Sequence, residues 1–197
     1  MSQAPDPRLY LIVPAGTPTD RLAAAVEAGD VACILLTGTG ADARALVDAA
    51  QDRGVAVLIP DEPELARRLG ADGVHLTGEA SVKTTRQALG GDGIVGVQCG
   101  RSRHTAMVVG EAGADYVAFA GTEDAPDGPA DPEVLRWWQL MMTLPCVAMG
   151  GCAPEDTGRL AQAGADFVAL GAGVWDDPDG PAAAVARAQA GLNALAA

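Results

Sequence analysis

Short apolar runs recur along the chain and alternate with longer stretches rich in Ala, Leu, Arg and Glu. Apolar runs of this length, bounded by Gly, Pro and Asp, predict buried strands, and the stretches between them predict helices. The expected strands cover residues 9–13, 32–36, 56–59, 74–76, 94–97, 116–119, 146–149 and 167–170. Strands that alternate with helices pair in parallel, and uninterrupted apolar runs are typical of a sheet that is covered on both faces.

A motif at the end of four predicted helices recurs with a regular spacing. In each copy a Gly turn leads to an Asp and then to a strand, with the Asp at positions 30, 72, 115 and 166, so that the intervals are 42, 43 and 51 residues. One strand–helix unit takes about 20 to 25 residues, so each interval holds two units. The pattern predicts an α/β protein, a single (β/α)8 TIM barrel over residues 1–197, with an open doubly wound sheet as the alternative. The near-constant period favours the closed barrel.

The charge balance excludes several classes of partner. The chain has 13 Lys and Arg against 26 Asp and Glu, a net charge of −13, which disfavours binding to nucleic acid or to an anionic membrane surface. No apolar run approaches the roughly 20 residues that span a bilayer, and residues 1–7 do not read as a signal peptide. The four cysteines stand singly inside apolar runs, so we expect free thiols and a cytoplasmic location. The sequence is compatible with a homo-oligomer.

Glycine-rich turns follow the last two predicted strands. In a TIM barrel the active site lies at the carboxyl ends of the strands, and phosphate commonly binds at the loops after strands 7 and 8. Gly150 and Gly151 follow strand 7, and Gly171 and Ala172 follow strand 8. We therefore expect their backbone N–H groups to bind the phosphate of a phosphorylated small molecule. The alternative is that these glycines only form turns.

Four other side chains at or near the strand ends are candidate ligand contacts: His75, Gln98, Arg101 and Thr122. His75 lies within strand 4, where a buried core histidine is the alternative to a general base. The second histidine, His104, follows the expected helix cap Ser102 and is expected on the surface.

Several of these segments resemble one known family. The segments are Gly70-Ala-Asp-Gly-Val-His-Leu76, Ala112-Gly-Ala-Asp-Tyr-Val117, Val147-Ala-Met-Gly-Gly151 followed by Pro154-Glu155, and Ala163-Gly-Ala-Asp166. They resemble the thiamine phosphate synthase/TenI family over nearly the whole chain. The resemblance implies a small (β/α)8 barrel of thiamine biosynthesis. Its synthases join a hydroxymethylpyrimidine pyrophosphate to a thiazole phosphate and release pyrophosphate with Mg²⁺, whereas TenI-type relatives isomerise a thiazole carboxylate phosphate.

The resemblance carries over unevenly to the site. The glycine turns that hold the thiazole phosphate in the family are present as Gly150, Gly151, Gly171 and Ala172. The pyrophosphate end departs from the family pattern: no cation follows strand 2, and acids at 123 and 124 stand in the loop after strand 6 where the family has a cation.

The metal end departs as well. Of the family's Mg²⁺ carboxylates only Asp61 and the nearby Glu79 remain, and Ala80 stands where an acid is expected, so we predict weak Mg²⁺ binding. We expect a family member that binds a thiazole phosphate-like ligand but is a poor synthase-type transferase. The alternatives are a non-catalytic or regulatory phosphate-binding barrel and a different isomerase or lyase on the same scaffold.

Overall fold

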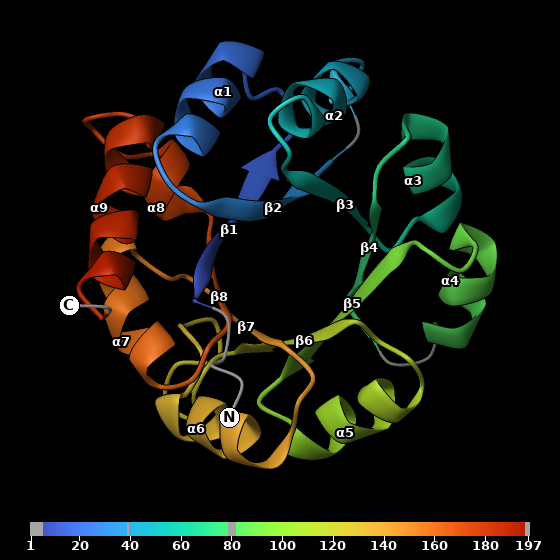
Figure 1. Ribbon diagram of the computed structural model, residues 1–197, viewed down its shortest axis with the longest axis vertical. Helices are drawn as coiled ribbons and strands as arrows, with labels where there is room; N and C mark the ends of the chain where they lie inside the picture. Colours follow the sequence, from blue (N-terminus) through green and yellow to red (C-terminus); the bar gives the residue numbers. More distant parts are fainter. Residues whose placement is uncertain (1–5, 39, 79–81, 196–197) are drawn as a thin grey trace.

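Eight parallel strands close into a barrel in a computed structural model that describes residues 6–38, 40–78 and 82–195 (Figure 1). The strands follow one another around the barrel in chain order, and the last pairs with the first. They are β1 (Arg8–Pro14), β2 (Val31–Thr37), β3 (Ala56–Pro60), β4 (Gly73–Leu76), β5 (Ile94–Gly100), β6 (Tyr116–Ala120), β7 (Cys146–Met149) and β8 (Phe167–Leu170). The predicted (β/α)8 barrel is confirmed, and the open sheet is wrong. Each expected strand lies inside an observed one.

Helices surround the barrel and cover its outer face (Figure 1). They are α1 (Thr19–Glu27), α2 (Ala43–Gln51), α3 (Pro63–Leu69), α4 (Val82–Leu89), α5 (Arg103–Glu111), α6 (Pro132–Met141), α7 (Thr157–Gln162), α8 (Ala172–Trp175) and α9 (Pro181–Asn193). The short helix α8 was not expected, and it inserts between β8 and the last covering helix α9. A 3₁₀ turn, Pro154–Asp156, precedes α7.

Side-chain hydrogen bonds cap two of the helices, and the expected cap Ser102 is one of them. The Ser102 hydroxyl accepts from the Thr105 amide at 3.0 Å, and the Asp131 carboxylate accepts from the Glu133 amide at 2.8 Å. Each bond satisfies an amide that the first turn of a helix leaves without an intrahelical partner. These caps fix where α5 and α6 begin.

The repeated Asp residues hold the strands together in pairs at their amino ends. Asp72, Asp115 and Asp166 each accept a hydrogen bond from the first or second amide of the preceding strand, at 2.7, 2.7 and 2.8 Å. Each also donates its own amide to the carbonyl of the same residue, at 2.8 to 3.0 Å. The side chain of the fourth, Asp30, pairs instead with Arg8 of β1 at 2.7 Å. We call these paired hydrogen bonds the Asp clamps. They occur once in every two strand–helix units, which explains the two-unit period seen in the sequence.

Two apolar clusters make up the core. The larger one lies between the strands and the helices and consists mainly of Val, Leu and Ala side chains. The smaller one lies inside the barrel and includes Tyr10, Leu58, Tyr116 and Val147. Gly96 faces this interior, and a Cβ at that position would overlap the Tyr116 ring. A glycine is therefore required in β5 for an aromatic ring to fit inside the barrel. No helix among the described residues is long and apolar enough to cross a membrane.

Candidate functional site

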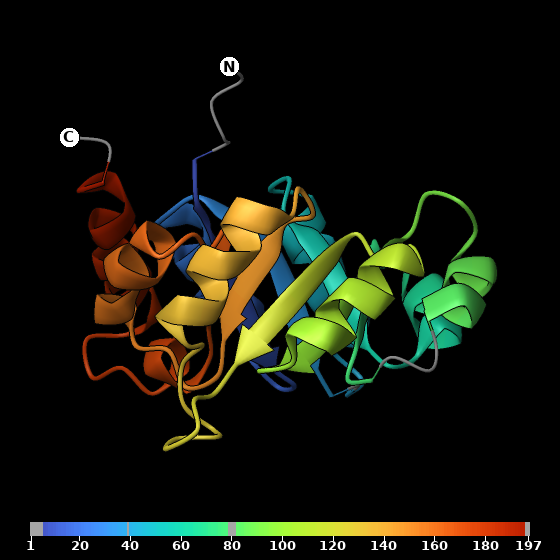
Figure 2. The same cartoon turned by 90° about the horizontal axis from the view of Figure 1, so that it is seen from below.

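The carboxyl ends of the strands converge at one end of the barrel, where the loop over residues 121–131 projects outward (Figure 2). Parallel strands bring all eight of the following turns to the same end, so the sequence-predicted site residues collect there.

The turn after β7 has two consecutive glycines in the left-handed region. Gly150 has φ +90° and Gly151 has φ +52°, a conformation that side chains rarely adopt. A Cβ on Gly150 would also overlap the Gly128 carbonyl oxygen of the loop that passes over it. Neither amide N–H hydrogen-bonds to another described residue. The turn therefore presents two free donors.

The turn after β8 lies against the turn after β7. A Cβ on Gly173 would be 3.3 Å from Cδ of Pro154 and 3.4 Å from the Cys152 carbonyl oxygen. Gly171 and Ala172 open helix α8, and their amides likewise make no hydrogen bond within the described ranges. Free amides from two adjacent turns suit an anion, because each N–H carries partial positive charge.

His75 lies on β4 and is buried in the barrel interior. It is 1% exposed, and its Nδ1 is 2.7 Å from the Tyr116 hydroxyl, which is 3.2 Å from the Tyr10 hydroxyl. Its Nε2 is buried and has no hydrogen-bond partner among the described residues. Burial lowers the pKa of His75 to about 4, against the opposing effects of the Asp61 charge and of contact with Gln98. The imidazole is therefore neutral at pH 7 and can serve as a hydrogen-bonding group.

The other candidate contacts lie nearer the rim. Gln98 is half-buried on β5 and contacts the His75 ring, whereas Arg101 is exposed and forms no ion pair with a described residue. The Thr122 hydroxyl accepts from the Ala125 amide at 3.0 Å and so helps to shape the projecting loop. The structure thus brings Gln98 to His75 and leaves Arg101 and Thr122 apart from that pair.

The cationic side chain Arg103 is not available at this end. Its guanidinium is 3.0 Å from a Glu133 carboxylate oxygen and lies over the Trp137 ring, 4.8 Å from the ring centroid. The second histidine, His104, is exposed as expected.

Asp61 is the described member of the expected metal pair. It has φ +53°, and its two carboxylate oxygens accept from the Thr77 amide at 2.9 Å and the Thr77 hydroxyl at 3.0 Å. Glu79 and Ala80 lie outside the described residues. In the described part of the chain no three His, Cys, Asp or Glu side chains cluster as metal ligands do. Asp61 is the single carboxylate of the expected pair among the described residues, and one carboxylate does not make a preformed magnesium site, so we derive no step through a metal.

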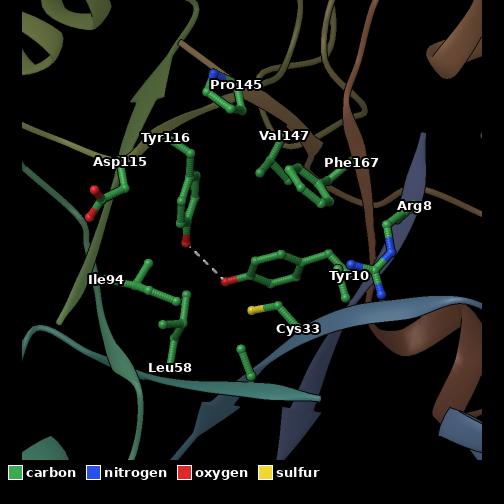
Figure 3. Close-up of a pocket in the computed structure, with 12 residues that line it drawn as sticks. Arg8, Tyr10, Cys33, Leu58, Ile94, Asp115, Tyr116, Pro145, Val147 and Phe167 are labelled. Atoms are coloured by element: carbon green, nitrogen blue, oxygen red, sulfur yellow. Dashed lines mark hydrogen bonds between the residues drawn. The ribbon is translucent and has the colours of Figure 1, made fainter. Parts of the chain in front are cut away.

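Three residues that contact the candidate site residues were missed by sequence reasoning. Tyr10 and Tyr116 connect to His75 through their hydroxyls (Figure 3 shows the bond between the two tyrosines), and Thr77 holds Asp61. Strand alternation could have placed Tyr10 and Tyr116 inside the barrel, but it could not have paired them.

The chain is similar to known thiamine-phosphate synthases in sequence and in fold. The sequence profile of the family described as thiamine monophosphate synthase matches residues 9–174. A thiamine-phosphate synthase of Rhodospirillum centenum is 50% identical, over 92% of this chain and 95% of the relative. One of Hyphomonas neptunium is 44% identical, over 98% of this chain and 96% of the relative. The solved structure of thiamine phosphate pyrophosphorylase from Pyrococcus furiosus superposes with a TM-score of 0.82 at 20% identity, over 96% of this chain and 97% of that one. The chain belongs to the thiamine phosphate synthase/TenI family.

Proposed function

We propose that this barrel binds a thiazole phosphate-like molecule at the carboxyl ends of its strands and is a slow thiamine-phosphate synthase. The observation that carries the proposal is the set of free amides at Gly150, Gly151, Gly171 and Ala172, in two turns that pack against each other. Backbone amides need no side-chain charge to hold a phosphate, which suits a chain with a net charge of −13.

The barrel interior below the turns offers neutral polar groups for the organic part of the ligand. His75 has a free Nε2, and the Gln98 amide contacts the same ring. A heteroaromatic ring seated between the glycine turns and His75 would place its ring atoms against neutral donors and acceptors. These two residues bind and orient the ring in this proposal.

The slow rate follows from the scarcity of cations near the leaving group. Release of pyrophosphate places negative charge on its oxygens, and each stabilising contact to such charge is worth about 2 to 4 kcal/mol. Arg101 is the described candidate for such a contact, while Glu123 and Asp124 add negative charge in the projecting loop. The loss of two or three such contacts lowers the rate by several powers of ten.

A second candidate is a synthase of ordinary rate, and the names of the relatives at 44 and 50% identity favour it. Steady-state release of pyrophosphate from the two precursors with Mg²⁺ separates the candidates. Turnover within about tenfold of the median enzyme rate of roughly 10 s⁻¹ would establish the ordinary synthase and refute the slow one. Binding without any turnover would point to a regulatory barrel.

The phosphate site has its own test, independent of turnover. Gly151→Asp places a carboxylate at the turn, and we expect calorimetric binding of the thiazole phosphate to be lost. Gly54→Asp is the matched control, because Gly54 also has positive φ (+71°), has open space around its Cβ and lies away from the site. Unchanged affinity in a folded Gly151→Asp variant would refute the assignment.

A further inference from the structure

A cavity of about 340 Å³ lies at the opposite end of the barrel from the glycine turns. Its lining residues lie at or near the amino ends of their strands, among them Arg8, Tyr10, Ala32, Ala56, Tyr116 and Phe167 (Figure 3). Nothing in the proposed reaction uses this end, since chemistry in such barrels takes place at the carboxyl ends of the strands.

The walls of the cavity are mostly apolar and aromatic. The rings of Tyr10, Tyr116 and Phe167 line it together with the aliphatic side chains of Leu58 and Ile94 (Figure 3). Edge-to-face contact between aromatic rings stabilises a complex in addition to the burial of apolar area. The walls therefore favour a planar, apolar body.

The charged groups at the cavity are already paired. The Arg8 guanidinium lies 2.7 Å from an Asp30 carboxylate oxygen, and the Asp115 carboxylate lies 2.7 Å from the Arg86 guanidinium. Burial raises the pKa of the Cys33 thiol and of both tyrosine hydroxyls, so these groups stay neutral at pH 7. An ion entering the cavity would lose part of its hydration without gaining an unpaired counter-charge, which disfavours charged ligands.

One hydrogen-bonding position remains open on the wall. The Tyr116 hydroxyl bonds both to Tyr10 and to His75 Nδ1. The Tyr10 hydroxyl bonds to Tyr116 at 3.2 Å and contacts the Cys33 thiol, and its oxygen has two lone pairs with which to accept. A ligand N–H or O–H can therefore donate to the Tyr10 oxygen. This position gives an apolar ligand a preferred orientation.

We propose that the amino-terminal mouth of the barrel is a second binding site, which takes a neutral aromatic molecule of one or two rings with one N–H or O–H donor. A dry apolar cavity of about 150 Å³ holds one benzene ring, so the volume here suits up to two fused rings. The site is separate from the phosphate site, and its fate does not depend on that proposal.

Indole is the probe, because it is neutral, has two fused rings and carries one N–H donor. Two-dimensional NMR of the full chain is expected to show saturable indole-induced shifts at the amides of residues around the mouth, such as Tyr10 and Phe167. Benzoate, a charged aromatic, should not produce them, and saturating inorganic phosphate should not displace indole. Absence of indole binding, equal binding of benzoate, or shifts centred on the glycine turns would overturn the proposal.

Substitutions that fill the cavity give the second line of the test. Ala56→Leu projects three more heavy atoms into the space, and we expect the affinity for indole to fall about tenfold or more. Ala32→Leu repeats the test from a neighbouring strand in case the first variant does not fold. Ala71→Leu is the control, since Ala71 is partly buried against the outer core and does not line the cavity. Unchanged affinity in folded Ala56→Leu and Ala32→Leu variants would refute the site.

A conservative change tests the orientation. Tyr10→Phe removes the acceptor and keeps the ring, so indole should bind several-fold more weakly, whereas naphthalene, which has no donor, should bind equally to both proteins. An equal loss for both probes would contradict the hydrogen bond to Tyr10.

Discussion

Acidification should destabilise the protein through His75. The pKa of His75 is about 4 in the folded protein against 6.5 for an ordinary histidine, and desolvation by burial is the main cause. As the pH falls, the unfolded chain therefore binds the proton before the folded protein does. The contribution of His75 to the free energy of unfolding is complete above pH 6.5 and is lost as the pH falls from 6.5 to 4. At 1.36 kcal/mol per pH unit this loss is about 3 kcal/mol.

Urea denaturation between pH 7.5 and 4.5 measures this loss. The sequence has two histidines, so His75→Gln removes the buried one and His104→Gln provides a matched control at an exposed one. We expect the free energy of unfolding of wild type and His104→Gln to fall by about 2 to 3 kcal/mol more than that of His75→Gln over this range. NMR titration of the His75 ring follows the same group directly. A parallel pH dependence in His75→Gln, or protonation of the folded-state ring near pH 6.5, would refute the reasoning.

Three further results are expected from the same structure. Gly96→Ala should lower the free energy of unfolding by about 1 to 3 kcal/mol or more, because the new Cβ overlaps the Tyr116 ring. Adding Tyr116→Ala should recover part of this loss in thermal unfolding, and an unaffected melting temperature in Gly96→Ala would contradict the close packing. Mg²⁺ should bind only weakly to the protein alone, because the described residues offer too few carboxylates and a ligand phosphate would have to complete its coordination. Tight binding in calorimetry would show that the metal site has been misread. Burial raises the pKa of the Cys146 and Cys152 thiols to about 12, so a thiol reagent at pH 8 should modify them slowly until urea unfolds the chain. Fast labelling of these two thiols in the folded protein would argue against their burial.

The barrel could be predicted from the sequence because its signals are local. Each strand is a short apolar run, and each Asp of the repeat stands at the junction of a helix and a strand, so position alone reveals the period. Helix α8 was missed because Ala172–Trp175 is one turn long, too short to show a helical periodicity. The role of Asp72 and Asp115 as clamps was missed too, since the amides they hold lie 15 and 20 residues away.

The candidate site likewise has features that are visible locally in the sequence and contacts between distant residues that are not. Glycine reveals a backbone requirement by its identity, so the turns at Gly150 and Gly171 could be found in the sequence. The environment of His75 could not be found in the sequence, because its partner Tyr116 is 41 residues away along the chain and Tyr10 is 106 residues from Tyr116. Contacts over such separations depend on strand register and on which side chains share the barrel interior. Strand alternation gives the inward face of each strand but not the pairs that meet there.

The Asp clamps have a consequence for how this barrel can change over time. They lie at the amino ends of the strands, while the glycine turns and the projecting loop lie at the other end. Mutations that remodel the loops therefore leave the hydrogen bonds that secure neighbouring strands intact, and they cost the fold little stability. A lineage could thus exchange a cationic loop for an acidic one, and lose or gain a reaction, without first having to restabilise its scaffold.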